Sequence, residues 1–388
     1  MSFAALERLR AGLAQRRDSR ALRHRQVLES AQGTYVNLSG QTWLSFCSND
    51  YLGLANHPAL IAAVCEAAPK MGVGAGASHL VCGHHVAHQE FELAFAEFVG
   101  APAALSFSTG YMANLAVVMA LIGRTGAIFA DKLNHASLND AALLSRARVS
   151  RFAHRDLAGL EQYMSACTQR DKLVISDGVF SMDGDMADVP GLLALCEKYD
   201  AWLLIDDAHG FGVLGASGQG ILAHYGVQSP RIIYLATLGK AAGVAGAVVA
   251  GESEVIEWLI QTARTYIYTT AAPPMLSVAL SASLREIARA APQRARLGEL
   301  IAQLRAGLQQ QGWPLMDSRT PIQPVVLGSN ATTLAVSERL AQQHIWVPAI
   351  RPPTVPENTG RLRITLSAQH TTQDVARLLD ALGNFHGK

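Results

Sequence analysis

The strongest constraint on this chain is an alternation of short apolar runs with helical stretches, from Thr42 to about Thr270. Short runs rich in branched apolar residues predict buried strands, whereas a 3.6-residue apolar period predicts a helix. Strands separated by helices need crossover connections, so the alternation predicts a mostly parallel central sheet with helices on both faces. The expected strands are residues 104–107, 127–130, 173–176, 202–206, 232–236 and 247–250, and the expected helices include 89–99, 111–121, 157–166 and 192–199.

A smaller unit is expected after this alternation. From about residue 282 a long helix dotted with arginines is expected to reach residue 311, and strands 325–327 and 362–366 flank a further helix. This mixture predicts an α+β domain. The predicted organisation is an N-terminal helix and arm at residues 1–44, a large domain at 45–281 and a small C-terminal domain at 282–388.

The N-terminal segment, residues 3–25, is rich in arginine and has four apolar residues at helical spacing: Phe3, Leu6, Leu9 and Leu13. Such a segment imitates a mitochondrial transit peptide, but the acidic residues Glu7 and Asp18 are atypical of one. We expect instead an amphipathic helix that packs on the body of the domain.

Composition excludes several classes of function. With 388 residues, 49% of them hydrophobic, the chain can bury a large core. Its 32 basic and 31 acidic residues give a net charge of +1, so no global field recruits nucleic acid or an anionic membrane. Five scattered cysteines indicate reduced thiols, and no apolar run reaches the roughly 18 residues that a membrane span needs. These features predict a cytoplasmic protein.

Lys240 is the central candidate for chemistry. It lies just past the expected strand 232–236 among glycines, where an amine is costly to bury unless it is paired or used covalently. Asp206 ends another expected strand, and His209 follows three residues later. These are the parts of a pyridoxal phosphate site, in which a lysine binds the cofactor covalently and a carboxylate keeps its pyridine nitrogen protonated. A surface lysine on a tight turn is the alternative.

Other strand ends carry polar residues that fit the same interpretation. Ligands bind beyond the carboxyl ends of parallel strands, so these residues are expected to share one site. The turn from Ser108 to Asn114 precedes an expected helix, whose first N–H groups suit a phosphate. The Thr237 hydroxyl is close enough in sequence to Lys240 to contact the same phosphate. His135 could stack on a flat ring, although a lone histidine is more often structural.

Three motifs are set aside. The glycines of residues 72–76 imitate a dinucleotide fingerprint, but no strand precedes them. His84, His85 and His88 with Glu90 have the spacing of metal ligands, but no further ligand cluster accompanies them. Asp206, Asp207 and His209 could also bind a metal, but that interpretation leaves Lys240 unexplained. No metal is therefore expected.

Five motifs together resemble the α-oxoamine synthase family of fold-type I pyridoxal phosphate enzymes: Thr237-Leu-Gly-Lys240, Asp206-Asp-Ala-His209, Asp177-Gly-Val-Phe-Ser-Met-Asp-Gly184, Asn134-His-Ala-Ser137 and Ser48-Asn-Asp-Tyr-Leu-Gly-Leu54. The resemblance covers about residues 40 to 380. It implies a fold-type I transferase, mostly parallel in its central sheet, with a smaller α+β C-terminal domain, acting as a homodimer with sites at the interface.

The run Ala349-Ile-Arg-Pro-Pro-Thr-Val-Pro356 resembles the biotin-pathway branch of that family. The branch implies a decarboxylative condensation of L-alanine with a pimeloyl thioester, carried either by coenzyme A or by acyl carrier protein. A sister synthase that uses glycine, such as glycine C-acetyltransferase, is the alternative, and an aminotransferase comes behind it. A regulatory module that binds DNA is disfavoured, because the chain has neither a basic face nor an appended helix-turn-helix domain.

The resemblance also implies roles for single residues. Lys240, His135, Asp206 and His209 would be catalytic. The cofactor would contact these four and also Gly110, Tyr111, Ser181, Thr237, Thr269 and Thr270, the last two reaching the phosphate of a neighbouring subunit. Substrate would contact Arg23, Asn49, Arg351, Thr354 and Arg363. Strand alternation independently predicts that Arg361, Arg363 and Thr365 share a polar face.

Two departures from the family pattern affect this interpretation. Asp177 stands where the family commonly has Glu, so the reach of its hydrogen bonds is in question. The loop at residues 76–80 has fewer glycines than is usual, and it includes His79. That loop faces the acyl substrate in the family, so the acyl chain is less defined by the sequence than the chemistry is.

Overall fold

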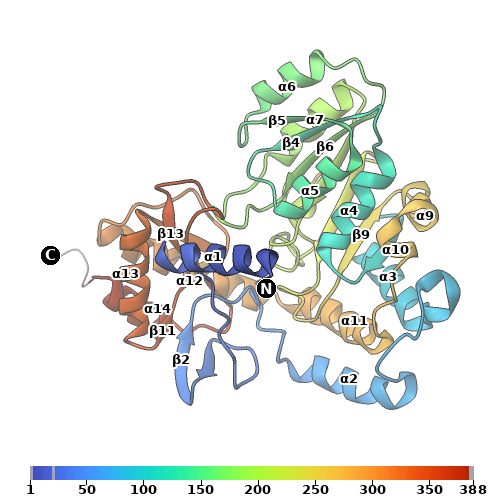
Figure 1. The fold of residues 1–388 in the computed structure, drawn as a ribbon. Helices are drawn as coiled ribbons and strands as arrows, with labels where there is room; N and C mark the ends of the chain where they lie inside the picture. The colour runs from blue at the N-terminus through green and yellow to red at the C-terminus, as the bar shows by residue number, and fades with distance from the viewer. Residues whose placement is uncertain (1–2, 20–21, 384–388) are drawn as a thin grey trace.

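A computed structural model describes residues 3–19 and 22–383 of the chain. At its centre is a seven-stranded sheet in the order β3-β9-β8-β7-β6-β4-β5 (Figure 1). The strands are β3 (Ala103–Phe107), β4 (Ala127–Asp131), β5 (Arg148–Phe152), β6 (Lys172–Asp177), β7 (Trp202–Asp206), β8 (Ile232–Thr237) and β9 (Ala247–Gly251). Only β9 runs antiparallel to its neighbours, so the predicted mostly parallel sheet is confirmed.

Helices cover both faces of this sheet, as Figure 1 shows. Alternate strand residues, such as Leu204 and Leu203, enter two different hydrophobic clusters, one on each face. The first cluster includes residues of α4 (Gly110–Leu121), α5 (Ala136–Ser145) and α9 (Ser253–Thr262), and the second includes residues of α6 (Leu157–Ser165) and α7 (Val189–Lys198). Two-sided burial explains the continuous apolar runs of β4 and β9, in which every residue is buried.

The sequence did not predict β5. It is an edge strand that pairs only with β4 in the described sheet, and Arg148, Val149 and Arg151 are exposed. An edge strand with charged residues lacks the apolar run that marks a buried strand. Its position nevertheless matters, because the chain that leaves β5 passes beside the end of β4.

A second region contains two three-stranded sheets, with the orders β10-β13-β12 and β1-β2-β11. Their strands are β1 (Tyr35–Leu38), β2 (Gln41–Ser45), β10 (Ile322–Gly328), β11 (Ile345–Trp346), β12 (Ala349–Ile350) and β13 (Gly360–Thr365). Helices α12 (Ala291–Gln310), α13 (Asn330–Ala341) and α14 (Thr372–Gly383) accompany them. The remaining helices are α2 (Pro58–Met71), α3 (Val86–Val99), α8 (Ile221–Tyr225), α10 (Arg264–Ile267) and α11 (Pro274–Arg289), with a π-helical turn η1 (His79–Gly83).

One predicted helix is wrong. The single long helix expected from residue 282 to 311 is two helices, α11 and α12, separated at Ala290. Pro292 in the first turn of α12 explains the break, since its ring clashes with the carbonyl four residues earlier. The predicted domain boundary at residue 282 lies inside α11, and the domain limits stay a prediction.

The N-terminal helix α1 (Ala4–Asp18) forms, but it does not pack on the body of the chain as predicted. None of its residues is buried, and Phe3, Leu9 and Leu13 remain exposed. Among the described helices, none combines the length and the hydropathy that crossing a lipid bilayer requires.

Candidate active site

The candidate site is a cavity of about 1000 Å³ beyond the carboxyl ends of β6, β7 and β8. This is where ligands bind in open parallel sheets. Eleven of the predicted site residues line it: Asn49, Gly110, Tyr111, His135, Ser181, Asp206, His209, Thr237, Lys240, Thr354 and Arg363. The predicted convergence of strand-end residues on one cavity is therefore what the structure has.

Lys240 lies in the turn between β8 and β9. Its Nζ donates a hydrogen bond to Thr237 Oγ1 at 2.9 Å. Burial lowers the pKa of Lys240 below its ordinary value, although Asp206 and Asp177 oppose this shift. The turn depends on Gly243, whose φ is 70°, and a Cβ there would come within 2.5 Å of the backbone of residues 54 and 55. The geometry thus presents an enclosed amine whose charged form burial disfavours.

A chain of hydrogen bonds connects Asp206 with His135. Asn114, fully buried in α4, donates through Nδ2 to Asp206 Oδ2 at 2.7 Å and to Ser137 Oγ at 2.9 Å. Ser137 Oγ lies 2.7 Å from His135 Nδ1. Asn114 Oδ1 has no hydrogen-bond partner, so the orientation of the amide is set by its two donor contacts. One amide therefore holds both the carboxylate and, through Ser137, the imidazole.

Asp177 pairs in register with Asp206 at the ends of β6 and β7. Its carboxylate accepts from the backbone N–H of His135 at 2.8 Å, and its own N–H donates to Asn134 Oδ1 at 3.1 Å. Burial and the neighbouring Asp206 raise the pKa of Asp177 well above its ordinary value. The shorter side chain at this position thus still reaches the backbone of the residue predicted to stack on the cofactor.

His209 is fully enclosed next to Tyr51. The Tyr51 hydroxyl lies 2.6 Å from His209 Nδ1 and donates to Asn49 Oδ1 at 3.2 Å. Burial and the charges of Lys240 and Arg363 keep the pKa of His209 well below its usual range, and burial raises the pKa of Tyr51 to about 12. His209 is therefore a neutral imidazole at physiological pH, held by a protonated phenol.

The first turn of α4 forms another side of the cavity and is the predicted phosphate site. Thr109 caps this helix by accepting from Met112 N, and the N–H groups of Gly110 and Tyr111 have no intrahelical acceptor. A Cβ at residue 110 would come within 2.5 Å of Thr237 Cγ2, so glycine permits the two segments to meet. The Tyr111 hydroxyl bonds Asp140.

Arg363 dominates the opposite side of the cavity. It is buried in β13, where its Nε donates to the Ser181 carbonyl at 2.6 Å and its Nη1 donates to Asn49 Oδ1 at 3.1 Å. Arg361, two residues earlier, pairs with Asp183 in the same loop. The face of β13 predicted from strand alternation thus packs against residues 181–183. The guanidinium groups of Arg361 and Arg363 are therefore directed inward rather than to solvent.

Four predicted residues lie outside this cavity. Thr269 and Thr270 follow α10 and do not line it. Arg23 and Arg351 line a second cavity of about 1170 Å³ that shares Thr354 with the first. Arg23 Nη2 donates to Thr354 Oγ1 at 3.4 Å, which joins the two cavities.

The histidines near residue 84 form a different cluster from the one that the spacing of His84, His85, His88 and Glu90 in the sequence suggests. His79, His84 and His88 bring one ligand atom each within 4.8 Å, whereas His85 caps α3. His88 Nδ1 accepts from His85 N and its Nε2 bonds Ala272 O, so both of its nitrogens already have protein partners.

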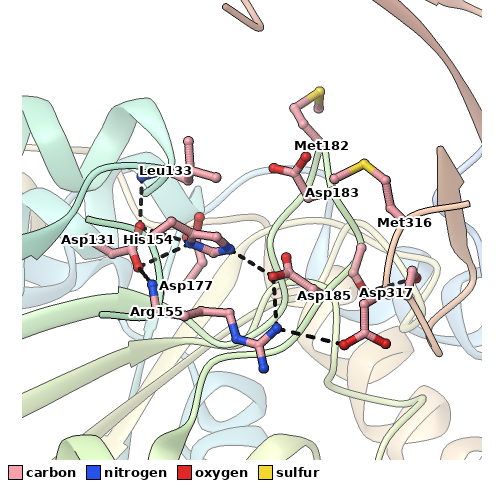
Figure 2. Close-up of polar contacts among 12 residues, drawn as sticks. Asp131, Leu133, His154, Arg155, Asp177, Met182, Asp183, Asp185, Met316 and Asp317 are labelled. Carbon is pink, nitrogen blue, oxygen red and sulfur yellow. Dashed lines mark hydrogen bonds and ion pairs between the residues drawn. The ribbon is translucent and has the colours of Figure 1, made fainter. Parts of the chain in front are cut away.

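Sequence reasoning missed Asn114, Tyr51 and His154 as residues that support the site. Asn114 lies in an apolar helical run, and its polarity there was the only signal in the sequence. Figure 2 shows His154 between Asp131 and Asp185, with Arg155 reaching Asp185 and Asp317. No local pattern connects these residues, because they come from four separate segments.

The chain belongs to the aminotransferase class I and II family, which matches residues 41–382. An 8-amino-7-oxononanoate synthase from Methylobacillus flagellatus is 59% identical over 377 residues, covering 97% of this chain and 95% of the relative. The solved structure of an 8-amino-7-oxononanoate synthase from Francisella tularensis is 31% identical, with a TM-score of 0.77 over 88% of this chain and 97% of that one. Sphingomonas wittichii serine palmitoyltransferase superposes with a TM-score of 0.93 at 29% identity, covering 98% and 97%. Within the family, this chain groups with the 8-amino-7-oxononanoate synthases.

The cofactor of this family is pyridoxal phosphate, and the cavity fits it. The amine of Lys240, the carboxylate of Asp206 and the free N–H groups of α4 supply the three functional groups that the aldehyde, the pyridine nitrogen and the phosphate need. Gly110 leaves room beside Thr237 for a phosphate to approach the backbone. The chain is therefore a pyridoxal phosphate-dependent enzyme.

Proposed function

We propose that this enzyme condenses L-alanine with a pimeloyl thioester and releases carbon dioxide and the free thiol of the acyl carrier, the step of biotin synthesis that yields 8-amino-7-oxononanoate. The observation that carries the proposal is the meeting of Lys240, Asp206 and Arg363 in one cavity. The names of relatives 54–61% identical to this chain support the choice of product.

The proposed cofactor contacts follow the layout of the cavity. Lys240 would hold the cofactor covalently, Asp206 would pair with its pyridine nitrogen and His135 would lie on its ring face. His209 would contact the phenolic oxygen, and Ser181 would line the site. Gly110, Tyr111 and Thr237 would hold the phosphate. Bound there, pyridoxal phosphate supplies an electron sink for the electron pair left on the alanine Cα.

The remaining tasks belong to side chains of this protein. The Arg363 guanidinium binds and orients the carboxylate of alanine, for which its planar donors are suited. Asn49, which accepts from Arg363 Nη1, fixes the angle of that guanidinium. The Lys240 amine removes the Cα proton and later returns one, and its burial favours the neutral form that a base requires.

The acyl donor is proposed to approach from the second cavity. Thr354 lies where the two cavities meet, on a segment stiffened by Pro352, Pro353 and Pro356. A hydroxyl on a stiff segment contacts substrate at little entropic cost. Arg351 and Arg23 would meet the distal carboxylate of the pimeloyl chain. The thioester carrier is coenzyme A or acyl carrier protein.

We also propose that the enzyme is a homodimer whose sites lie at the interface. Two observations support this: the apolar residues of α1 are exposed, and Thr269 and Thr270 lie outside the cavity of their own chain. In a dimer, a neighbouring subunit would cover the apolar residues of α1 and accept Thr269 and Thr270 at its own cavity. Sedimentation at working concentration tests the proposal, and an active monomer contradicts it.

A product assay tests the function. The purified enzyme is incubated with L-alanine and either pimeloyl-CoA or pimeloyl-acyl carrier protein, and in parallel with glycine and acetyl-CoA or succinyl-CoA. We expect the nine-carbon amino-ketone 8-amino-7-oxononanoate to form with L-alanine and a pimeloyl thioester, and no corresponding product to form with glycine. Faster turnover of glycine with a short acyl thioester would assign the chain to a sister synthase.

A further inference from the structure

His154 lies outside the cavity, two residues after β5, yet both of its ring nitrogens face carboxylates. Its Nδ1 is 3.1 and 3.2 Å from the two oxygens of Asp131, and its Nε2 is 2.7 Å from Asp185 Oδ2 (Figure 2). The ring also packs edge-on against Phe180 at 4.3 Å. An imidazole that donates from both nitrogens carries two protons and is positively charged. Burial opposes that charge, but the two carboxylates outweigh it and raise the pKa of His154 to about 9.

Asp131 begins the turn that presents His135. The carboxylate of Asp131, at the end of β4, accepts from Leu133 N at 2.8 Å and from Arg155 N at 2.9 Å. The turn ends at His135, whose N–H bonds Asp177. The carboxylate therefore fixes the start of the segment whose other end lies in the cavity, and His154 fixes the carboxylate.

Asp185 lies in the loop that supports Arg363. The backbone N–H of Phe180 donates to the Asp185 carbonyl at 3.0 Å, which closes the loop. The Ser181 carbonyl in this loop accepts from Arg363 Nε, and Asp183 pairs with Arg361. The guanidinium thus contacts a loop that Asp185 connects to His154.

The geometry points to His154 as a positioning residue that holds two separate parts of the site with one charged ring. Through Asp131 it orders the turn on the cofactor side, and through Asp185 it orders the loop on the amino-acid side. Arg155 is a weaker second link, since it is 42% exposed and its Nη1 is 3.4 Å from Asp185 Oδ2. The effect through Asp185 on amino-acid binding rests on the proposed function, whereas the effect through Asp131 on cofactor binding does not.

Two uncharged substitutions separate the contact with Asp131 from the contact with Asp185. The Nδ2 of an asparagine occupies nearly the position of His Nδ1, so His154→Asn keeps a donor for Asp131 and loses the one for Asp185. The Nε2 of a glutamine takes the place of His Nε2, so His154→Gln keeps the donor for Asp185 and loses the one for Asp131. Both variants lose the same charge, so a difference between them reports which contact was lost. Arg155→Gln is the matched control for a change at this surface.

The experiment measures two binding constants in the purified holoenzymes and two regions of backbone hydrogen exchange. We expect His154→Asn to weaken L-alanine binding, followed by the visible spectrum, about tenfold and to leave the cofactor dissociation constant within twofold. His154→Gln is expected to weaken cofactor binding about fivefold and to leave alanine binding within twofold. Exchange should rise at residues 178–186 in the first variant and at 132–136 in the second. Arg155→Gln is expected to change both constants by less than twofold.

A merely structural role predicts a different result. If both variants shift the two constants equally, or leave both within twofold of the native enzyme, the inference is overturned. If the native enzyme binds no amino acid, the proposed function has failed, and the exchange pattern and cofactor constants still decide the role of His154. Should one variant not fold, the other is judged against Arg155→Gln by the same measurements.

Discussion

The two sides of the cavity are built in different ways. The cofactor side uses the ends of neighbouring strands, so Asp177 and Asp206 are adjacent simply because β6 and β7 pair in register. The substrate side joins segments far apart in the chain, such as Arg363 and Asn49, which are 314 residues apart. The cofactor side is a rigid frame of paired strands that lie close together in the chain. The substrate side forms only when the C-terminal strand β13 packs against residues near the N-terminus.

Charge also differs between the two sides. Asp206, Asp177 and Lys240 form a compact buried group at the cofactor side, where the carboxylates face an amine. Arg363 lies on the other side, and Arg23 and Arg351 line the adjoining cavity, which suits the proposed binding of substrate carboxylates. We therefore expect cofactor binding and substrate binding to be separable, so that substitutions on one side of the cavity leave the function of the other side largely intact.

The largest effect is expected from Lys240→Ala. Without the amine the cofactor cannot be held covalently and the Cα proton has no base, so turnover is expected to fall about 10⁴-fold. Borohydride treatment followed by peptide mapping should attach the cofactor to Lys240 in the native enzyme and to no residue in the variant. Lys198→Ala, at an exposed ion pair with Glu161, is the control. Attachment at any other lysine contradicts the assignment.

Asp206→Asn tests the cofactor side with a side chain of nearly the same size, whose single oxygen can still accept from either Asn114 Nδ2 or Ala208 N. An amide cannot keep the pyridine nitrogen protonated, so exchange of the alanine α-proton with solvent deuterium is expected to slow about 10³-fold. Alanine binding should change little. Asn114→Ala removes the amide donor to Asp206, and we expect a smaller loss of about tenfold. Undiminished exchange in Asp206→Asn would contradict the role of Asp206 in keeping the pyridine nitrogen protonated.

Arg363→Lys is the matched test of the substrate side. Lysine keeps the charge but loses the planar pair of donors, so the KM for alanine is expected to rise about 100-fold. The visible absorbance of the bound cofactor should stay unchanged. A loss of cofactor together with alanine binding would mean that the two sides are not separable.

Arg351→Ala and Arg23→Ala sharpen the comparison within the substrate side. If either residue meets the distal carboxylate, its loss should raise the KM for the pimeloyl thioester about tenfold and leave alanine binding nearly unchanged. A monocarboxylic thioester of equal length should then be used as well as the dicarboxylic one. Equal use of both donors by the native enzyme would remove the reason for a carboxylate subsite.

The last expected effect is on stability rather than on activity, at the link between the two sides. His154 faces Asp131 and Asp185, and the neighbouring Arg155 reaches Asp185 and Asp317. Its pKa rises from 6.5 to about 9 on folding, so its contribution is full below about pH 6.5 and is lost as pH rises through 9. His154→Phe keeps the ring packing and is expected to cost about 3 kcal/mol at pH 6, by ~1.4 kcal/mol per pKa unit.

Urea titrations at pH 6 and pH 10 measure this difference in the free energy of unfolding. The gap between native and variant should nearly close at pH 10. A gap that stays constant with pH would mean that His154 contributes through packing against Phe180 alone.

The sequence by itself determined the core sheet and the chemistry at its edge. Buried strands are local apolar runs, and parallel pairing brings their carboxyl ends together whatever the rest of the chain does. Asp206, Thr237 and Lys240 could therefore be assigned to one site before any tertiary contact was known. The resemblance to a known family added the residues of the substrate side, which local patterns do not connect.

Only the tertiary structure decided the parts that depend on distant partners. β5 carries charges because it lies at an edge, and α1 keeps its apolar residues exposed within this chain. The contact of Asn114 with Asp206 spans 92 residues, and His154 joins a carboxylate at the end of β4 to one in a distant loop. A hydrogen bond between remote segments leaves no periodic trace in a sequence, since its geometry is set by how the elements pack rather than by neighbours along the chain.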